Sequence, residues 1–389
     1  MRAGIVSLVL AYILSQFFRA FLAVMTPYLA ADLATTPQVL ASASGYWFLA
    51  FALMQIPVGA ALDRIGPRLT ASALLVCAAL GAAIFARASG HGEIKFAMIL
   101  IGIGCSPVLM ASYYIFARSF SPAVFGTLAG MVIGIGSLGN LAASVPLSMA
   151  VEALGWRGTM WGLAAVTLVT ALAIWVLVRD PARVVHTAKG SILDLLRLPQ
   201  LWPILLMMAA CYAPAAGLRG LWAGPYLADV FGADAAEIGR ATFVMGLAMV
   251  AGNFAYGPLD RILGTRKWLV MGGNTLMLLC FVVLWQRPAQ SEVLAIALMA
   301  GIGFFGASFP MVMAHGRAFL PPHLVGRGVT LINLFGIGAT GLMQIATGSL
   351  HASVIATPSE APFAALFLFY AGLIAAGLLI YLTSKDRTD

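Results

Sequence analysis

Two arginines stand inside long stretches of sequence that are otherwise apolar and contain no Asp or Glu. They are Arg19, in the first such stretch, and Arg219, in the seventh. A charged side chain at membrane depth is costly unless it faces water or a partner, so its presence indicates a function. The planar guanidinium group donates paired hydrogen bonds to carboxylate or carbonyl oxygens. The two residues therefore predict a site for an anionic or carbonyl-rich solute; the alternative is packing against backbone carbonyls or helix C-termini.

Other polar and aromatic residues occur on the same helix faces or on neighbouring stretches. Tyr12, Gln16 and Arg19 fall at i, i+4 and i+7, which is one face of a helix. An apolar cavity with a few convergent polar and aromatic groups suits a flat organic ligand. The alternative for each residue is a hydrogen bond between helices. The predicted substrate site consists of Arg19, Arg219, Tyr12, Gln16, Tyr113, Tyr212, Trp222, Asn253 and Asn333.

A charged loop follows the second apolar stretch, and a related loop follows the eighth. The first reads Gly-Ala-Ala-Leu-Asp-Arg-Ile-Gly-Pro-Arg over residues 59–68, and the second reads Gly-Pro-Leu-Asp-Arg-Ile-Leu-Gly-Thr-Arg-Lys over residues 257–267. A carboxylate at a helix end can pair with a base or cap a neighbouring helix N-terminus. Such pairs would hold one face closed and break when it opens; the alternative is loop charge that only fixes topology. The predicted gating residues are Asp63, Arg64, Arg68, Asp260, Arg261 and Arg266.

The sequence lacks the motifs of enzymes and metal sites. It contains no Walker A sequence, no nucleophile elbow and no metal-spaced His/Cys cluster. The four cysteines lie far apart in apolar stretches, which argues against disulfides and indicates buried apolar side chains. The net charge of +8 is spread over single or paired bases, without the basic stripe of a nucleic-acid-binding protein. We therefore expect no enzymatic activity, no cofactor, no bound metal and no nucleic-acid partner.

Proton coupling normally needs a titratable group within the membrane. Because no carboxylate lies inside the apolar stretches, His315, near the end of the tenth stretch, is the one candidate. The other histidines are expected in loops; they are His91, His186, His323 and His351. A facilitator, or coupling by an unusual route, is therefore favoured over a carboxylate-driven proton symporter.

The amino-acid composition predicts that transmembrane helices carry these residues. Apolar residues make up 61% of the 389 and charged residues only 9%, against about 25% charged residues in soluble domains. A surface so poor in charge needs lipid as its solvent, and about 20 apolar residues of helix cross a bilayer. We predict an all-α polytopic membrane protein with twelve transmembrane helices over residues 5–30, 43–62, 69–88, 95–118, 123–150, 157–178, 200–228, 239–259, 267–286, 293–318, 325–350 and 361–382.

Basic residues fix the expected orientation of these helices. With the N-terminus inside, most of the 22 Lys and Arg residues fall on the inner side of the membrane, and cytoplasmic loops carry such an excess. Both termini are therefore expected in the cytoplasm. We expect a multi-pass protein of the bacterial inner membrane, embedded in the lipid bilayer and monomeric.

Short sequences of the first half return in the second half at a nearly constant distance. They are Pro-Tyr-Leu-Ala at 27–30 and 225–228, Asp-Arg-Ile at 63–65 and 260–262, and Gly-Ile-Gly at 102–104 and 301–303. A repeat of six helices indicates two pseudo-symmetric halves related by an axis along the membrane normal. We predict an N-terminal half over 1–180, a cytoplasmic linker over 181–199 and a C-terminal half over 200–389. Arg19 and Arg219 are then repeat partners.

The loop of residues 59–68 resembles the signature Gly-x-x-x-Asp-Arg-x-Gly-Arg-Arg of the major facilitator superfamily of transporters, and residues 257–267 are a degenerate copy. The resemblance extends over the whole chain, with twelve helices, two halves and a central linker. It implies secondary transport by alternating access, with the first and seventh helices lining a central cavity. Arg19 and Arg219 would then lie near the solute.

Within that superfamily the sequence resembles the CcoA-like subfamily of bacteria. The similar stretches are residues 15–24, 47–68 and 315–319. Copper importers of this group carry Met-x-x-x-Met on helix seven and His-x-x-x-Met on helix eight. The corresponding residues here are Gly217 and Leu221, and Met245 and Met249, so only Met249 matches. Another branch resembles riboflavin uptake proteins, whose ligand suits an aromatic, Arg-containing cavity. We expect uptake of a small organic solute such as riboflavin, with copper import as the alternative.

Efflux of drugs or metabolites is a third alternative. Gly126, Gly130 and Gly134 predict a small-residue packing face on the fifth helix. The Gly-Pro pair expected in the antiporter motif is absent from this helix. Efflux is therefore ranked below uptake.

Overall fold

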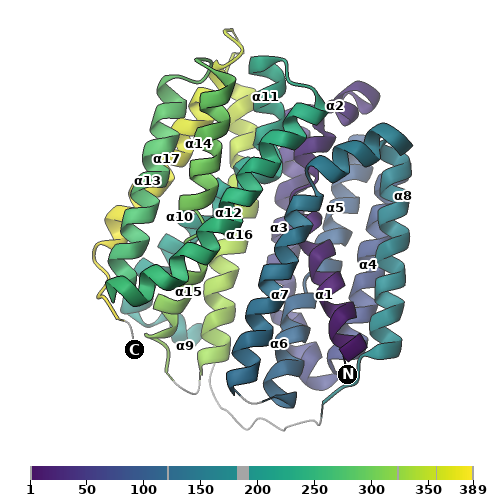
Figure 1. Cartoon of the computed structure of the whole chain (residues 1–389), viewed down its shortest axis with the longest axis vertical. Helices are drawn as coiled ribbons and strands as arrows, with labels where there is room; N and C mark the ends of the chain where they lie inside the picture. Colours follow the sequence, from purple (N-terminus) through teal and green to yellow (C-terminus); the bar gives the residue numbers. More distant parts are fainter. Residues whose placement is uncertain (1, 121, 182–191, 322–323, 356, 388–389) are drawn as a thin grey trace. The chain divides into compact units, whose positions relative to one another are not determined.

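Helices form all the regular structure of the described residues. The computed structural model describes residues 2–120, 122–181, 192–321, 324–355 and 357–387 (Figure 1). In these ranges ten helices are long and apolar enough to cross a membrane, or eleven if one bent pair counts as a single span. A shorter apolar helix, Met131–Ala142, lies within the predicted fifth span. The expectation of an all-α polytopic membrane protein is confirmed.

The first half of the chain folds as one compact unit, Met1–Val185. Within it α1 packs against α7 and α8, α3 against α5, and α4 against α5 and α8. Figure 1 shows α1, in purple, beside α7. Its helices are α1 (Arg2–Phe17), α2 (Leu22–Leu33), α3 (Pro37–Arg64), α4 (Pro67–Arg87), α5 (His91–Cys105), α6 (Val108–Ser119), α7 (Pro122–Ala142) and α8 (Val145–Leu177).

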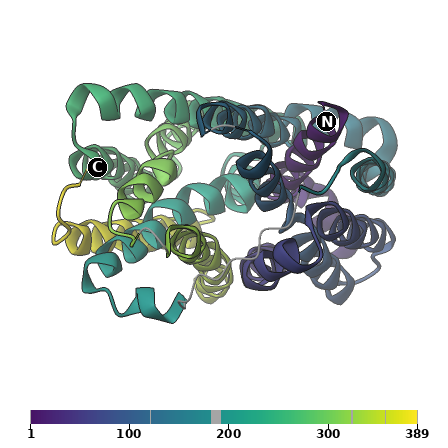
Figure 2. The same cartoon turned by 90° about the horizontal axis from the view of Figure 1, so that it is seen from below.

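The second unit, His186–Asp389, repeats this packing. Its α10 packs against α16 and α17, α12 against α14, and α13 against α14 and α17. Figure 2 shows several helices of each unit along their axes. Its elements are α9 (Ile192–Leu196), the 3-10 helix η1 (Pro199–Leu201), α10 (Trp202–Gly217), the π-helix η2 (Leu218–Trp222), α11 (Ala223–Phe231), α12 (Ala235–Leu263), α13 (Arg266–Gln286), α14 (Glu292–Phe305), α15 (Phe309–Arg317), α16 (Val325–Ser353) and α17 (Ala361–Tyr381).

Part of the predicted linker, 181–199, lies outside the described residues, which omit 182–191. This omission includes His186, and His323 is likewise outside the described residues. The described end of the linker contains α9 and the first residue of η1.

The prediction of one continuous first helix over residues 5–30 was wrong. α1 ends at Phe17, α2 begins at Leu22, and the two axes are bent by 54°. The intervening turn contains i→i+3 hydrogen bonds, such as that from the Arg19 N–H to the Gln16 carbonyl (3.3 Å). Phe21 packs on Phe85 of α4 with ring centroids 5.4 Å apart. Tertiary packing of aromatic rings, which the hydropathy pattern does not show, accompanies the break.

The seventh predicted helix, 200–228, is also irregular. It consists of η1, α10, η2 and α11, so the π-helix Leu218–Trp222 interrupts the α-helical hydrogen bonding. Arg219 lies in this π-helix, and Arg19 lies in the turn between α1 and α2. Single turns of π-helix inside α-helices are frequent at functional sites. Both halves of the repeat therefore depart from α-helix at their arginine.

Proline and glycine explain the shape of the predicted fifth span, 123–150. α7 ends at Ala142 and α8 begins at Val145. Pro146 lacks an N–H, and its ring conflicts with the carbonyl four residues earlier, which is that of Ala142. Gly155 then interrupts α8 with a φ of 69°, a conformation that favours glycine. The span predicted as one helix is therefore broken at residues 143–144, and Gly155 lies beyond it, before the predicted sixth span, 157–178.

The glycines at which α7 approaches α1 are not the predicted ones. A Cβ at Gly136 would lie 2.2 Å from the Tyr12 ring, and one at Gly139 would lie 2.0 Å from the Ile13 carbonyl oxygen. A Cβ at Gly134 would meet nothing within 4 Å. The surroundings of Gly126 and Gly130 are outside what the structure describes. Gly134 therefore takes no part in the contact of α7 with α1, which Gly136 and Gly139 make on another face of the helix.

Candidate functional site

The guanidinium group of Arg19 lies over two aromatic rings of α3. Its Cζ is 5.4 Å from the centroid of Trp47 and 4.7 Å from that of Phe51. The two rings are stacked with centroids 5.2 Å apart, and both are buried. A cation–π contact contributes about 0.5–2 kcal/mol. It fixes the guanidinium group without neutralising its charge, so the group can still attract an anionic or carbonyl oxygen.

Three other predicted substrate residues of the first unit lie together. The Gln16 side-chain amide donates to the Tyr12 hydroxyl at 2.7 Å. The half-buried Tyr113 of α6 is an electrostatic neighbour of Tyr12. Gln16 is near the end of α1, three residues before Arg19 in the turn that follows, and the Arg19 N–H donates to the Gln16 carbonyl at 3.3 Å. The unit thus combines phenol, amide and guanidinium groups with a stacked aromatic pair.

Arg219 of the second unit is buried, with 5% of its surface exposed. The Gln344 side-chain amide donates to the Gly217 carbonyl at 3.4 Å, next to the π-helix. Trp222 is fully buried and donates from Nε1 to the Thr347 hydroxyl at 3.0 Å. These contacts tie η2 to α16 and fix the backbone that carries Arg219.

His351 was expected in a loop, but it lies in α16 with its ring centroid 5.1 Å from that of Trp222. His91 likewise begins α5 instead of lying in a loop. His91 lies four residues before the predicted helix start at 95, and His351 lies one residue after the predicted helix end at 350, so both predicted helices were slightly too short. Helix boundaries are the weakest part of such predictions.

The remaining predicted substrate residues lie on three different helices of the second unit. The ring of Tyr212, on α10, is 4.8 Å from that of Phe309. Asn333 is half-buried on α16, and Asn253 is exposed on α12. The neighbouring Gly252 packs closely on α14, where a Cβ would lie 2.3 Å from the Phe304 carbonyl oxygen. Asn253 therefore points away from the α12–α14 contact.

The two methionines at the copper-importer positions make apolar contacts. Met245 is buried, and a Cβ at Gly303 would lie 2.7 Å from its carbonyl oxygen. Met249 packs against a cluster that contains Tyr256. Leu221, at a helix-seven position of the copper motif, is fully buried. In the part of the chain that the structure describes, no group of three or more His, Cys, Asp or Glu is placed to hold a metal ion.

The charged loop of the first unit makes two ion pairs. Asp63 Oδ1 lies 3.7 Å from a terminal nitrogen of Arg118. Arg68 Nε lies 3.8 Å from Asp180 Oδ2, and the Arg68 backbone N–H donates to Asp180 Oδ1 at 2.8 Å. Asp180 thereby caps the N-terminus of α4. Gly66 adopts a φ of 109°, and a Cβ there would lie 2.9 Å from the Asp180 carboxyl carbon.

The second unit also has a loop ion pair and a capping carboxylate, but its loop carboxylate pairs with a different arginine. Asp260 Oδ2 lies 3.4 Å from Arg266 Nε, and the backbone N–H of Lys267 donates to Asp386 Oδ1 at 3.0 Å. The Thr265 hydroxyl also donates to Asp386. Burial raises the pKa of the Asp386 carboxyl, but the hydrogen bonds from Thr265 and Lys267 outweigh it, so this pKa lies below its ordinary value. Asp386 therefore caps α13 as an ionised carboxylate at neutral pH.

These two capping carboxylates were missed at the level of sequence. Each follows a base just after the last apolar span of its half, as Arg179-Asp180 and Lys385-Asp386. That shared pattern could have identified them. Arg64 and Arg261, which were predicted to act in gating, are exposed in the last turns of α3 and α12. A cation there is favoured by the partial negative charge of a helix C-terminus.

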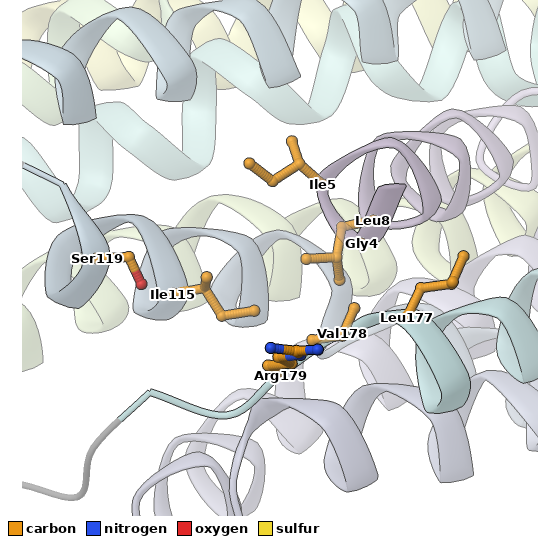
Figure 3. Close-up of a pocket in the computed structure, with 8 residues that line it drawn as sticks. All are labelled: Gly4, Ile5, Leu8, Ile115, Ser119, Leu177, Val178 and Arg179. Atoms are coloured by element: carbon orange, nitrogen blue, oxygen red, sulfur yellow. The ribbon is translucent and has the colours of Figure 1, made fainter. Parts of the chain in front are cut away.

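A pocket lies in the first unit where the start of α1 meets the ends of α6 and α8 (Figure 3). It is lined by Gly4, Ile5, Leu8, Ile115, Ser119, Leu177, Val178 and Arg179. None of the predicted substrate residues lines it. The pocket is therefore distinct from the Arg19 group.

Comparisons with known proteins agree with this architecture. Residues 8–218 match the sequence profile of the Major Facilitator Superfamily. The probable L-galactonate transporter of Escherichia coli (strain K12) is 24% identical over 340 residues, which cover 81% of this chain and 69% of that protein.

Solved structures show the same fold. The D-xylose-proton symporter superposes with a TM-score of 0.79 at 14% identity, covering 100% of this chain and 98% of that chain. A bacterial homologue of the human lysosomal transporter Spinster, in an inward-facing and occupied conformation, superposes with a TM-score of 0.75 at 16% identity. The match covers 97% of this chain and 95% of that chain. At such identities the likeness concerns the fold alone.

Proposed function

The chain belongs to the Major Facilitator Superfamily, whose members are non-enzymatic membrane carriers, and we propose that this secondary transporter takes up a small organic solute with carboxylate or carbonyl oxygens. The observation that carries the proposal is the Arg19 guanidinium group, fixed over Trp47 and Phe51. The resemblance to the superfamily implies that α1 and α10 line the solute pathway. Arg219 stands at the equivalent point of the repeat, in a π-helix.

Two solutes are candidates for this site. Riboflavin is the first, because its flat ring system suits aromatic neighbours such as Tyr12 and Tyr113, and its carbonyls suit a guanidinium fork. A sugar acid is the second, because a relative is named as a probable L-galactonate transporter and a carboxylate pairs well with arginine. Copper(I) is the competitor, and the apolar packing of Met245 and Met249 does not favour it.

The roles of the remaining residues follow from their contacts. Tyr12, Gln16 and Tyr113 would extend the Arg19 site, while Trp222 would support Arg219 because its N–H is already engaged by Thr347. Tyr212, Asn253 and Asn333 complete the proposed set. The proposed gate consists of the charged-loop residues Asp63, Arg64, Arg68, Asp260, Arg261 and Arg266.

We also propose the membrane placement expected from charge. The excess of Lys and Arg on one side of the predicted spans supports cytoplasmic termini. A relative from Escherichia coli supports a bacterial inner membrane. The protein would act as a monomer.

Uptake into proteoliposomes tests the function. Labelled riboflavin, L-galactonate and copper(I) are offered separately to vesicles with and without the protein, and one of the two organic solutes is expected to enter. Arg19→Ala and Arg219→Ala should each reduce uptake at least about 10-fold, because a charged hydrogen bond is worth about 1.5–3 kcal/mol. Arg19→Lys keeps the charge but loses the paired donors, so it should restore uptake only in part.

Arg240→Ala is the matched control. This arginine is exposed on α12 and pairs with Glu237 one turn away, so uptake should not change. Entry of copper(I) without either organic solute would reverse the assignment. Unaltered uptake in both arginine variants would remove Arg19 and Arg219 from the site.

A further inference from the structure

One face of α16 carries three polar side chains that are fully buried in the second unit. They are Thr340, Gln344 and Thr347, which fall at i, i+4 and i+7. A buried polar group is costly unless it has a hydrogen-bond partner. The Thr340 hydroxyl donates to the Gly336 carbonyl of its own helix at 2.9 Å. Gln344 and Thr347, by contrast, make hydrogen bonds to the segment around Arg219.

These two side chains of α16 contact the two ends of the π-helix η2. The Gln344 amide donates at 3.4 Å to the carbonyl of Gly217, the residue before η2. The Thr347 hydroxyl accepts at 3.0 Å from Nε1 of Trp222, the last residue of η2. Pro214, one turn before η2, has no N–H to donate within the helix. Because a π-helix is rare compared with an α-helix, we expect η2 to depend on contacts such as these two.

The Thr347 hydroxyl has a defined role in its contact with Trp222. Its single hydrogen is donated within α16, to the Met343 carbonyl at 2.7 Å. Its oxygen can therefore only accept from the indole N–H, which is a donor and never an acceptor. The Trp222 ring also lies against His351 and Phe363, with centroids 5.1 Å and 6.5 Å away. Rotation of η2 would leave the fully buried indole N–H without its acceptor, which is unfavourable.

We propose that Thr347 is a positioning residue for solute binding: its hydroxyl holds Trp222, and Trp222 fixes the π-helix that directs Arg219. The inference rests on the proposed function, in which Arg219 binds the carboxylate or carbonyl oxygens of the solute. Trp222 follows Arg219 by three residues in the same five-residue element, so the two side chains turn together when η2 rotates. Thr347 therefore acts on the solute through Arg219 and needs no contact with it.

Uptake kinetics in proteoliposomes compare Thr347 with its neighbour on the same face of α16. The probes are labelled riboflavin and labelled L-galactonate. Thr347→Val keeps the shape of the side chain but removes the acceptor, so KM should rise about fivefold, as for one ordinary hydrogen bond, while the maximal rate changes less than about twofold. Thr347→Ser keeps the hydroxyl and should retain the original KM. Thr340→Val loses a bond within α16 and should also leave KM unchanged.

A double variant tests whether Thr347 acts through Arg219. In the Arg219→Ala background, Thr347→Val should not raise KM further, because the effects of coupled residues are not additive. An equal rise in KM with and without Arg219 would overturn the inference. Reduced uptake in Arg219→Ala beside an unchanged KM in Thr347→Val would overturn the inference alone. Unchanged uptake in Arg219→Ala would remove Arg219 from the site, and the inference with it.

Chemical modification of Arg219 tests the inference without transport. Phenylglyoxal reacts with arginine side chains, and mass spectrometry of the peptides gives the rate at the buried Arg219 relative to Arg19 in the other unit. Loss of one hydrogen bond should make local opening of η2 about fivefold more frequent, so Thr347→Val should raise this rate by the same factor. Thr347→Ser and Thr340→Val should not.

This rate also separates the inference from the choice of solute. If neither riboflavin nor L-galactonate enters the vesicles, the proposed solutes are wrong, and the modification rate still decides the role of Thr347. Equal rates at Arg219 in Thr347→Val and Thr340→Val would show that the Thr347 hydroxyl does not hold η2.

Discussion

The guanidinium group of Arg19 owes its position to a break in the helix that carries it. The turn between α1 and α2 and the aromatic pair of α3 together fix the group. The repeat places Met245 and Met249 at the positions that Trp47 and Phe51 hold in the first unit. The two halves therefore share an arginine, but the positions that supply its aromatic partners in the first unit hold methionines in the second, so Arg19 and Arg219 need not contact a solute in the same way.

A prediction at the scale of single residues concerns the close contact between α1 and α7. Gly139→Ala would place a methyl group 2.0 Å from the Ile13 carbonyl oxygen, whereas Gly134→Ala meets nothing within 4 Å. Overpacking of this kind costs about 1–3 kcal/mol. Thermal unfolding in detergent should show a lower midpoint for Gly139→Ala and an equal or higher one for Gly134→Ala, because alanine favours helix over glycine. Equal midpoints for the two variants would contradict the close contact.

Some helix ends are set by the local sequence, and others are set by tertiary packing. Pro146 ends α7, and Gly155 bends α8, by purely local rules. The N-terminus of α4, by contrast, is capped by Asp180, which lies 112 residues away from its partner Arg68 in the chain. Only the packing of α4 on α8 brings that carboxylate into place. Asp386 does the same for α13 in the other unit.

At the scale of the helices, the cap that Asp180 provides leads to a prediction about the N-terminus of α4. Asp180→Asn keeps the shape of the side chain but removes its charge, so the start of α4 should lose about 1 kcal/mol of stabilisation. Hydrogen exchange of the peptide that contains residues 66–72 should become faster. Asp194→Asn is the control, because that carboxylate pairs with the exposed Arg197 at 4.0 Å in a short helix. Exchange that is unchanged in Asp180→Asn would show that the cap does not hold α4.

At the scale of the whole molecule, the chain consists of two units that repeat one packing scheme. The contacts of α10, α12 and α13 in the second unit reproduce those of α1, α3 and α4 in the first. Each unit has its own buried core, formed by residues such as Trp47 and Phe85 in one and Trp222 and Phe281 in the other. Folding of each half should therefore depend mainly on contacts within that half.

This organisation predicts the behaviour of split chains. Residues 1–185 and 186–389, produced together as separate chains, should restore solute uptake to a large part of the level of the intact chain. A cut between Gly162 and Leu163, inside α8, should abolish uptake because α8 packs on α4 within one unit. The measurement is uptake by cells that express each pair. Equal uptake from both pairs would argue against independent units.

The sequence alone determined the membrane class, the helical fold and the repeat, because hydropathy and spacing report directly on the cost of placing side chains in lipid. It also located Arg19, Arg219 and the charged loops, since isolated charges and repeated motifs are visible in one dimension. Only the tertiary structure decided the break at Arg19, the π-helix at Arg219 and the Asp180 and Asp386 caps. Those features depend on which distant groups meet once the helices pack, and local spacing does not encode such contacts.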